Sequence, residues 1–276
     1  MRVDWRRIVI AAGGVFVAGL AACESAPPAV DDGVELQHAT LGDGSQVGFV
    51  DEPIEAPEEP PQEMFEPVPM SGEFSPPSIA ARLGIPLSEV YTGSARKAAK
   101  LSVATGETKT FNSVRTLRSS LLTDAEVKEI EPKLNDGSKT GRRDFENQNV
   151  RVTAWIYAAK KSDDDNDYHV VIGTNPSNVT RKLMTVEISG ISDEFGHASE
   201  LMEARRQWKE MMGSALPGEG SYRKYQPPIK VRVEGSVFYD WTHRNHIGGN
   251  SEPGPKGFKP GTAWEIHPVT GIERLN

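Results

Sequence analysis

From residue 149 to the C-terminus, the chain consists largely of segments in which apolar and polar residues alternate. The apolar positions of the first segment are Val150, Val152, Ala154, Ile156 and Ala158. Successive side chains of a β-strand point to opposite faces, so this pattern predicts a long strand with one buried face. Comparable segments lie at residues 167–172, 183–189, 229–237 and 263–275. The C-terminal half of the chain is therefore expected to be mainly β.

One helix is predicted between the third and fourth strands. Ser199 is a suitable N-cap, and Gly213 follows the last position of the helical pattern. The apolar stripe between them consists of Leu201, Ala204, Trp208 and Met211. The order β-β-β-α-β-β is that of an OB-like, five-stranded Greek-key barrel, and we expect this fold for residues 148–276.

Residues 78–147 are predicted to be a partly helical N-terminal extension of the barrel. Short helices are expected at residues 78–83 and 95–101. Thr123 and Glu126 have the spacing of a capping box, which predicts a third helix that ends before Asn135.

The segment before this extension is rich in acidic residues and proline. Residues 24–81 carry thirteen acidic side chains and no Lys or Arg, and residues 24–77 contain ten of the twenty prolines. Proline removes backbone donors and like charges repel, so residues 23–77 are predicted to form a disordered tether. The formal charge of −8 comes from this segment, because residues 82–276 carry +3.

The N-terminus has the pattern of an export signal. Three arginines precede an uninterrupted apolar stretch at residues 8–22. The tetrad Leu20-Ala21-Ala22-Cys23 resembles the bacterial lipobox, which implies that residues 1–22 are removed and that Cys23 carries the lipid. We therefore expect an exported lipoprotein that is anchored in the outer membrane and faces the periplasm. The alternative is an ordinary signal peptide with Cys23 there by chance.

Several motifs of the C-terminal part resemble those of one family of exported bacterial proteins. They are D-x-D-Y-H at residues 165–169, W-E-I-H-P-V at residues 264–269, and the stretches 152–156, 184–190 and 231–240. The resemblance covers roughly residues 148–275. It supports export and the domain boundary, and it implies no activity.

Two acid–histidine pairs are candidates for chemistry. Asp167 and His169 lie two residues apart on one predicted strand, as Glu265 and His267 do on another, so each pair shares a face. The residues that can join them are Glu187, Asp240 and His243. Such a set is suited to zinc or another divalent metal, or to a carboxylate-oriented general base. The alternative is a hydrogen-bonded polar ladder along the barrel.

A second candidate site is the Gly-rich loop at residues 241–262. Besides His243, its basic residues are Arg244, His246, Lys256 and Lys259. Together with exposed Trp155 and Tyr157 they suit an anionic polymer or a saccharide. An irregular loop without a ligand is the alternative. Nucleic acid is disfavoured because export separates the head from it and the head has no dense basic stripe.

Two functions follow from these observations. The first is a lipid-anchored envelope protein whose OB-like head binds an envelope protein or a glycan without catalysis. The second is a metal-dependent hydrolase that uses Asp167, His169, Glu265 and His267. The sequence contains no phosphate-binding loop, nucleophile elbow or His-Glu-x-x-His motif, so the common enzyme classes lack support.

Overall fold

The structure of the chain is a computed structural model. It describes residues 35–53, 75–135, 137, 140–176, 183–245 and 254–276. The predicted signal peptide (residues 1–22), the lipidation site Cys23, and residues 24–34 and 54–74 of the predicted tether lie outside the described residues. His246 of the candidate ligand loop also lies outside them.

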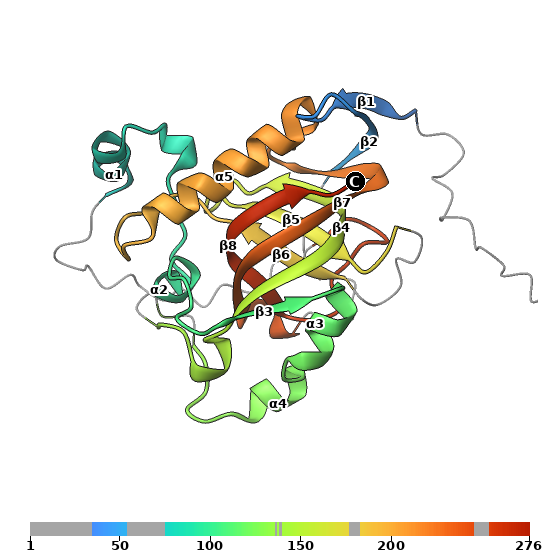
Figure 1. Cartoon of the computed structure of the whole chain (residues 1–276). Coiled ribbons are helices and arrows are strands. Elements are labelled where there is room, and N and C mark those ends of the chain that lie inside the picture. Colours follow the sequence, from blue (N-terminus) through green and yellow to red (C-terminus); the bar gives the residue numbers. More distant parts are fainter. Residues whose placement is uncertain (1–34, 54–74, 136, 138–139, 177–182, 246–253) are drawn as a thin grey trace, which may run out of the picture.

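Five strands form a closed barrel (Figure 1). They are β4 (Asn149–Lys161), β5 (Tyr168–Gly173), β6 (Met184–Ile188), β7 (Ser221–Tyr239) and β8 (Trp264–Arg274). Around the barrel the order is β4-β5-β6-β8-β7, and the pairing of β7 with β4 closes the ring. The β6–β8 pair is parallel and the other pairs of the barrel are antiparallel. The prediction of a mainly β fold with a five-stranded barrel is confirmed.

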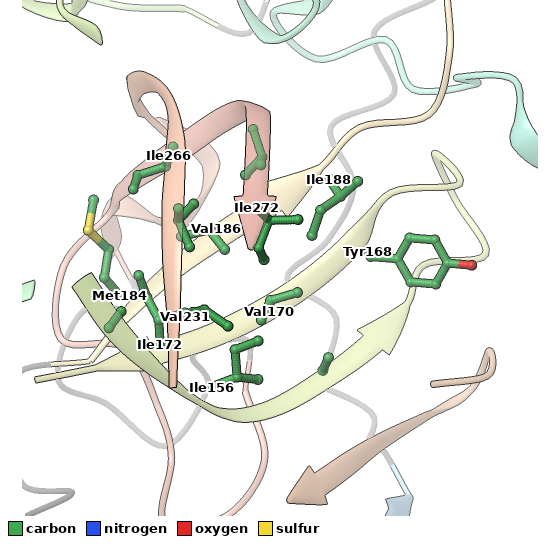
Figure 2. Close-up of a cluster of buried hydrophobic side chains, with 14 of the residues drawn as sticks. Ile156, Tyr168, Val170, Ile172, Met184, Val186, Ile188, Val231, Ile266 and Ile272 are labelled. Carbon is green, nitrogen blue, oxygen red and sulfur yellow. The ribbon is translucent and has the colours of Figure 1, made fainter. Parts of the chain in front are cut away.

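Branched aliphatic side chains fill the interior of the barrel (Figure 2). Met184, Val186 and Ile188 of β6 all face this interior, as predicted from their alternation. Side chains of the neighbouring strands pack against them: Val170, Ile172, Val231, Ile266 and Ile272. Burying one such side chain contributes roughly 1.5–3 kcal/mol, so this core is the main source of stability for the barrel.

Helix α5 (Ala198–Met212) crosses the barrel and packs on β6 and β8 (Figure 1). Its Trp208 reaches the core and lies against Tyr168, with ring centroids 5.9 Å apart. The helix begins two residues earlier than predicted, because His197 and not Ser199 is the N-cap. Met212 is buried in place of the predicted Met211, which is half-buried.

The two longest strands differ from their predictions at one end each. In β4 the register shifts between Ile156 and Ala158, so Ala158 leaves the core-facing row and Ala159 joins it. Such a bulge adds one residue and breaks strict alternation. Strand β7 begins at Ser221, although Pro227 and Pro228 indicated a loop there.

Two strands form within the segment predicted to be a disordered tether, so that prediction is wrong for residues 37–53. Strand β1 (Gln37–Thr40) pairs with β2 (Gln46–Pro53), and β2 pairs with β7. Val47 and Phe49 are buried in the barrel core. Residues 29–52 contain no proline, and the average composition of the longer acidic segment hid this hairpin.

The extension before the barrel is partly helical, as predicted. Its helices are α1 (Pro76–Leu83), α2 (Lys97–Lys100), α3 (Val114–Ser120) and α4 (Asp124–Glu129). The capping box of Thr123 and Glu126 is present at the start of α4. Strand β3 (Thr108–Phe111), which was not predicted, pairs in parallel with β4. None of the described helices is long and apolar enough to span a membrane.

A buried ion pair within this extension contacts the barrel through the backbone of Tyr239 in β7. The Arg96 side chain, just before α2, donates from both terminal nitrogens to the Glu146 carboxylate, at 2.8 and 2.7 Å. Glu146 also accepts from the backbone nitrogens of Tyr239 and Arg143. Both charged groups are almost completely buried, so each depends on the other to offset its lost hydration.

We expect Glu146→Ala to lower the free energy of unfolding by about 3–5 kcal/mol, because it leaves the Arg96 guanidinium buried without a counter-charge. Urea denaturation monitored by circular dichroism measures this change. The matched control is Glu234→Ala, which removes the exposed partner of Arg151 and should cost about 0–1 kcal/mol. Equal effects of the two substitutions would show that the buried pair does not hold the extension on the barrel.

Candidate metal centre

The outer face of three neighbouring strands carries the candidate site. Tyr168 and Val170 face the core, so His169 between them points to the outer face of β5. Its partner across the strand pair is Glu187 of β6. On β8 the same alternation places Glu265 and His267 on the outer face. The pairing of β5 with β6 and of β6 with β8 therefore brings both predicted acid–histidine pairs to one surface.

Three of these side chains form a fully buried set, which we call the inner group: Asp167, Glu187 and His267. The His267 Nδ1 atom lies 2.5 Å from a Glu187 oxygen, and its Nε2 atom lies 3.4 Å from an Asp167 oxygen. One possible ligand atom from each residue lies within 4.8 Å of the other two. The side chains are at most 1% exposed.

Three others form a second set, the outer group: Asp240, His243 and Glu265. The His243 Nδ1 atom lies 3.3 Å from an Asp240 oxygen and 3.4 Å from a Glu265 oxygen. Asp240 follows the end of β7, and His243 lies in the 3₁₀ turn Thr242–Asn245. The His243 side chain is 29% exposed, which distinguishes this group from the inner one.

The two groups are contiguous. One oxygen of Glu265 faces His243, and the other lies 3.9 Å from the His267 Nδ1 atom. Glu187 likewise extends to His169, whose Nδ1 atom is 3.5 Å from its second oxygen. All seven residues predicted for the polar or metal cluster thus lie together in the structure.

Two further residues of the cluster were missed from the sequence. The ammonium of Lys100 lies 3.9 Å from carboxylate oxygens of both Glu187 and Asp240. Asp165 lies 3.9 Å from the His169 Nε2 atom. Asp165 is the first residue of the D-x-D-Y-H motif but was not among the predicted site residues, and nothing in the sequence links Lys100 of α2 to the strands.

The segment around Val90 covers this face of the barrel. The Val90 carbonyl accepts a hydrogen bond from the Asn166 side chain, and the Tyr91 backbone nitrogen donates to Ile191. Gly190 permits this close approach, because a Cβ atom there would lie 2.8 Å from the Tyr91 Cα atom. The Gly190 backbone nitrogen donates to Asp167. The covering segment therefore removes the inner group from solvent.

The cluster contains more negative than positive charge. Its five carboxylates face one lysine, which leaves a formal charge of −4 when the three histidines are neutral. Buried charge is costly unless a counter-charge balances it. Either protons on the imidazoles or a bound cation must supply that balance.

Without a cation, the cluster retains protons. Burial opposes the charged form of His267, but the Glu187 carboxylate outweighs it and raises the pKa to about 9. Burial also opposes protonation of His243, and Asp240 raises its pKa to about 9. Burial and the charge of Asp165 raise the pKa of Asp167 to about 8. The pKa of Glu187 is held well below its usual value, because His169 and His267 outweigh burial.

Many buried polar atoms of the cluster lack a hydrogen-bond partner within the described part of the chain. They are one oxygen each of Asp167 and Glu265, both oxygens of Glu187, both ring nitrogens of His267, and Nε2 of His169. More than nine in ten buried polar groups in proteins are normally satisfied. Each of these atoms nevertheless lies within 3.9 Å of a carboxylate oxygen or ring nitrogen of the same cluster. Protonated imidazoles or a cation shared by the ligands would satisfy them.

The structure describes only part of the candidate ligand loop. The Arg244 side chain and His246 lie outside what is described. Lys256 is exposed, its backbone nitrogen donates to Glu52 of β2, and Lys259 is half-buried. Phe258 of the same loop packs on Tyr157, with ring centroids 5.4 Å apart.

The expected aromatic surface is wrong for Tyr157. That side chain is 1% exposed, covered by Phe258, and its hydroxyl donates to the Asn175 carbonyl. The bulge after Ile156 brings Tyr157 and Ala158 into one apolar cluster. Trp155 is half-buried, with the Lys230 ammonium 6.0 Å from its ring.

No protein-family model, curated protein or solved structure matches the chain. The resemblance to a family of exported bacterial proteins therefore stays a prediction. The structure does show that the two motifs carrying it meet in space. The first motif contributes Asp167 and His169 to the cluster, and the second contributes Glu265 and His267.

We expect the metal-free protein to lose stability as the pH rises from about 6.5 to 9. Raised pKa values of His243 and His267 stabilise the folded state fully below 6.5, and this contribution is lost as the pH passes their folded values near 9. Asp167 acts in the same direction up to about pH 8. Urea denaturation across this range, in the presence of a chelator, measures the slope.

The comparison for this prediction is between two variants. The double variant His243→Gln/His267→Gln should flatten the pH dependence, and His38→Gln, at an exposed position, should leave it unchanged. A free energy of unfolding that is constant or rising over this pH range in the unmodified protein would contradict the prediction.

Proposed function

We propose that this protein is an exported, lipid-anchored protein of the bacterial cell envelope whose barrel head binds a divalent transition-metal ion, with zinc as the leading candidate. The inner group of Asp167, Glu187 and His267 is the proposed site. One observation carries the proposal. Three potential ligands from different segments of the barrel converge within 4.8 Å, are fully buried, and present atoms with no hydrogen-bond partner among the described residues.

The ligand chemistry fits this class of ion. One imidazole and two carboxylates form a mixed nitrogen and oxygen set, which suits zinc and its first-row neighbours. Ligands 2.0–2.2 Å from a tetrahedral zinc ion lie roughly 3.3–3.6 Å from one another. The His267–Asp167 separation of 3.4 Å, measured from Nε2, falls in that range. The 2.5 Å contact with Glu187 is made by the other ring nitrogen, Nδ1, and one ion binds only one of the two nitrogens. The three donor atoms, which lie within 4.8 Å of one another, therefore have to move closer together around the ion.

An OB-like Greek-key arrangement is the finer description that we propose for the barrel. The pairing order β4-β5-β6-β8-β7, with α5 between β6 and β7 in the chain, supports it. In OB barrels the face of the second and third strands and the loops beside it bind ligands. The candidate centre lies on the corresponding face, formed by β5 and β6.

Burial favours binding over catalysis at the inner group. A catalytic zinc ion keeps a position open to water or substrate. Here Asp167 and His267 are completely buried beneath the segment around Val90. A metal held there stabilises the folded head, which then presents its surface to an envelope protein or a glycan. The hydrolase hypothesis requires an accessible ligand set, which the inner group does not offer.

We expect the purified full-length protein to retain divalent metal and His267→Gln to weaken its binding at the inner group by at least about 100-fold, since even changes beside a ligand cost 10–100-fold. Plasma mass spectrometry gives the metal content, and competition with a chromogenic chelator gives the affinity. The matched control is His197→Gln, because His197 also lies beside a carboxylate, Glu200, at 3.6 Å but outside the cluster. A protein that binds neither zinc nor manganese would overturn the proposal.

The lipid anchor has its own test. The proposal of outer-membrane anchoring rests on the arginines and the apolar stretch that precede Cys23. We expect Cys23→Ser to leave the precursor unprocessed or to release the protein from the membrane fraction, because the substitution removes the acceptor of the lipid. Cell fractionation and immunoblotting measure this. Unchanged processing and membrane association in the variant would contradict the lipid anchor and leave the metal proposal standing.

A further inference from the structure

The two carboxylate oxygens of Glu265 face different sets of ligands. One lies 3.4 Å from the His243 Nδ1 atom of the outer group, and the other lies 3.9 Å from the His267 Nδ1 atom of the inner group. We propose that the outer group holds a second divalent metal ion and that Glu265 bridges the two ions in a dinuclear centre. This inference rests on the proposed function, because it adds a second ion to the first.

The outer group has the donors that such an ion requires. Asp240, His243 and Glu265 each offer an atom within 4.8 Å of the other two. Asp240 is held in place from the other side, because its second oxygen accepts from the backbone nitrogen of Thr242 at 2.8 Å. The oxygen that faces His243 is therefore fixed before any ion binds, which lowers the cost of binding.

The Glu265 oxygen that faces the inner group supports the bridge independently of the outer group. Its side chain is 2% exposed, and the oxygen that faces the inner group has no hydrogen-bond partner among the described residues. A buried carboxylate oxygen that lacks a donor is costly. A bridging carboxylate satisfies both of its oxygens by placing one on each ion.

The charge of the cluster also fits two ions. With neutral imidazoles the five carboxylates and Lys100 carry a formal charge of −4. One divalent cation leaves −2 in a largely buried site, whereas two cations balance the charge. Lys100 contacts one carboxylate of each group, Glu187 and Asp240, so it fixes the two groups relative to each other.

The two sites differ in solvent exposure, so the two proposed ions should be released to a chelator at different rates. The His243 side chain is 29% exposed, whereas the inner group is at most 1% exposed. Three protein ligands with one partly exposed imidazole leave room for a water molecule on the outer ion. The outer ion should therefore leave to a chelator first, and the inner ion should follow more slowly.

Metal content of the full-length protein tests the second site. After loading with zinc and removal of excess metal, we expect about two ions per chain, as in other two-metal centres. His243→Gln should reduce the content to about one ion and abolish the fast phase of release to a chromogenic chelator. His197→Gln is the control and should change neither. Circular dichroism and thermal unfolding confirm that each variant is folded.

Paramagnetic resonance of the manganese-loaded protein tests whether Glu265 bridges the two ions. Two manganese ions about 3.5–4 Å apart give a spin-coupled paramagnetic resonance spectrum, which isolated ions do not. We expect the coupled spectrum in the unmodified protein. Glu265→Gln keeps the size of the side chain but removes its charge, and it should abolish the coupling.

The outcomes separate this inference from the proposed function. One ion per chain, lost in His267→Gln and retained in His243→Gln, would overturn the second site and uphold the first. Two ions without spin coupling would overturn the bridge formed by Glu265. No bound metal in any form of the protein would overturn the proposed function and the dinuclear centre together.

Discussion

The pairing of β7 with β4 is the constraint on which the rest of the structure depends, because it closes the barrel. Closure leaves the barrel strands with an inner face that is filled by aliphatic side chains and an outer face that is not. Alternation along β5, β6 and β8 then fixes which residues share the outer face. The candidate centre is therefore a direct consequence of barrel closure, and a one-residue slip in any of these three strands would disperse it.

Much of the barrel was predictable because its segments alternate strongly in hydropathy. The same alternation placed Asp167 with His169, and Glu265 with His267, on shared faces. Convergence of the two pairs was not predictable, since it depends on the parallel pairing of β6 with β8. Lys100 was beyond reach of any local pattern, because the ion pair of Arg96 outside the strands brings α2 to the site.

The errors of prediction also have physical causes. The hairpin of β1 and β2 was hidden within an acidic segment, because its apolar residues, Val47 and Phe49 among them, are few. Tyr157 was expected on the surface because the bulge after Ile156 leaves no mark in the sequence. An average composition over a long segment hides a short pair of strands. A count of alternating residues that does not allow for a bulge assigns the residues after it to the wrong face.

The hairpin also changes where the head can stand above a membrane. With Cys23 as the proposed anchor, the chain that connects it to the head ends at Gln37, where β1 begins, and not at the start of the helices. Fourteen residues span at most about 50 Å even when fully extended. The start of β1 must therefore lie within that distance of the bilayer. Residues 54–74 join two points of the head, so their length adds nothing to this reach.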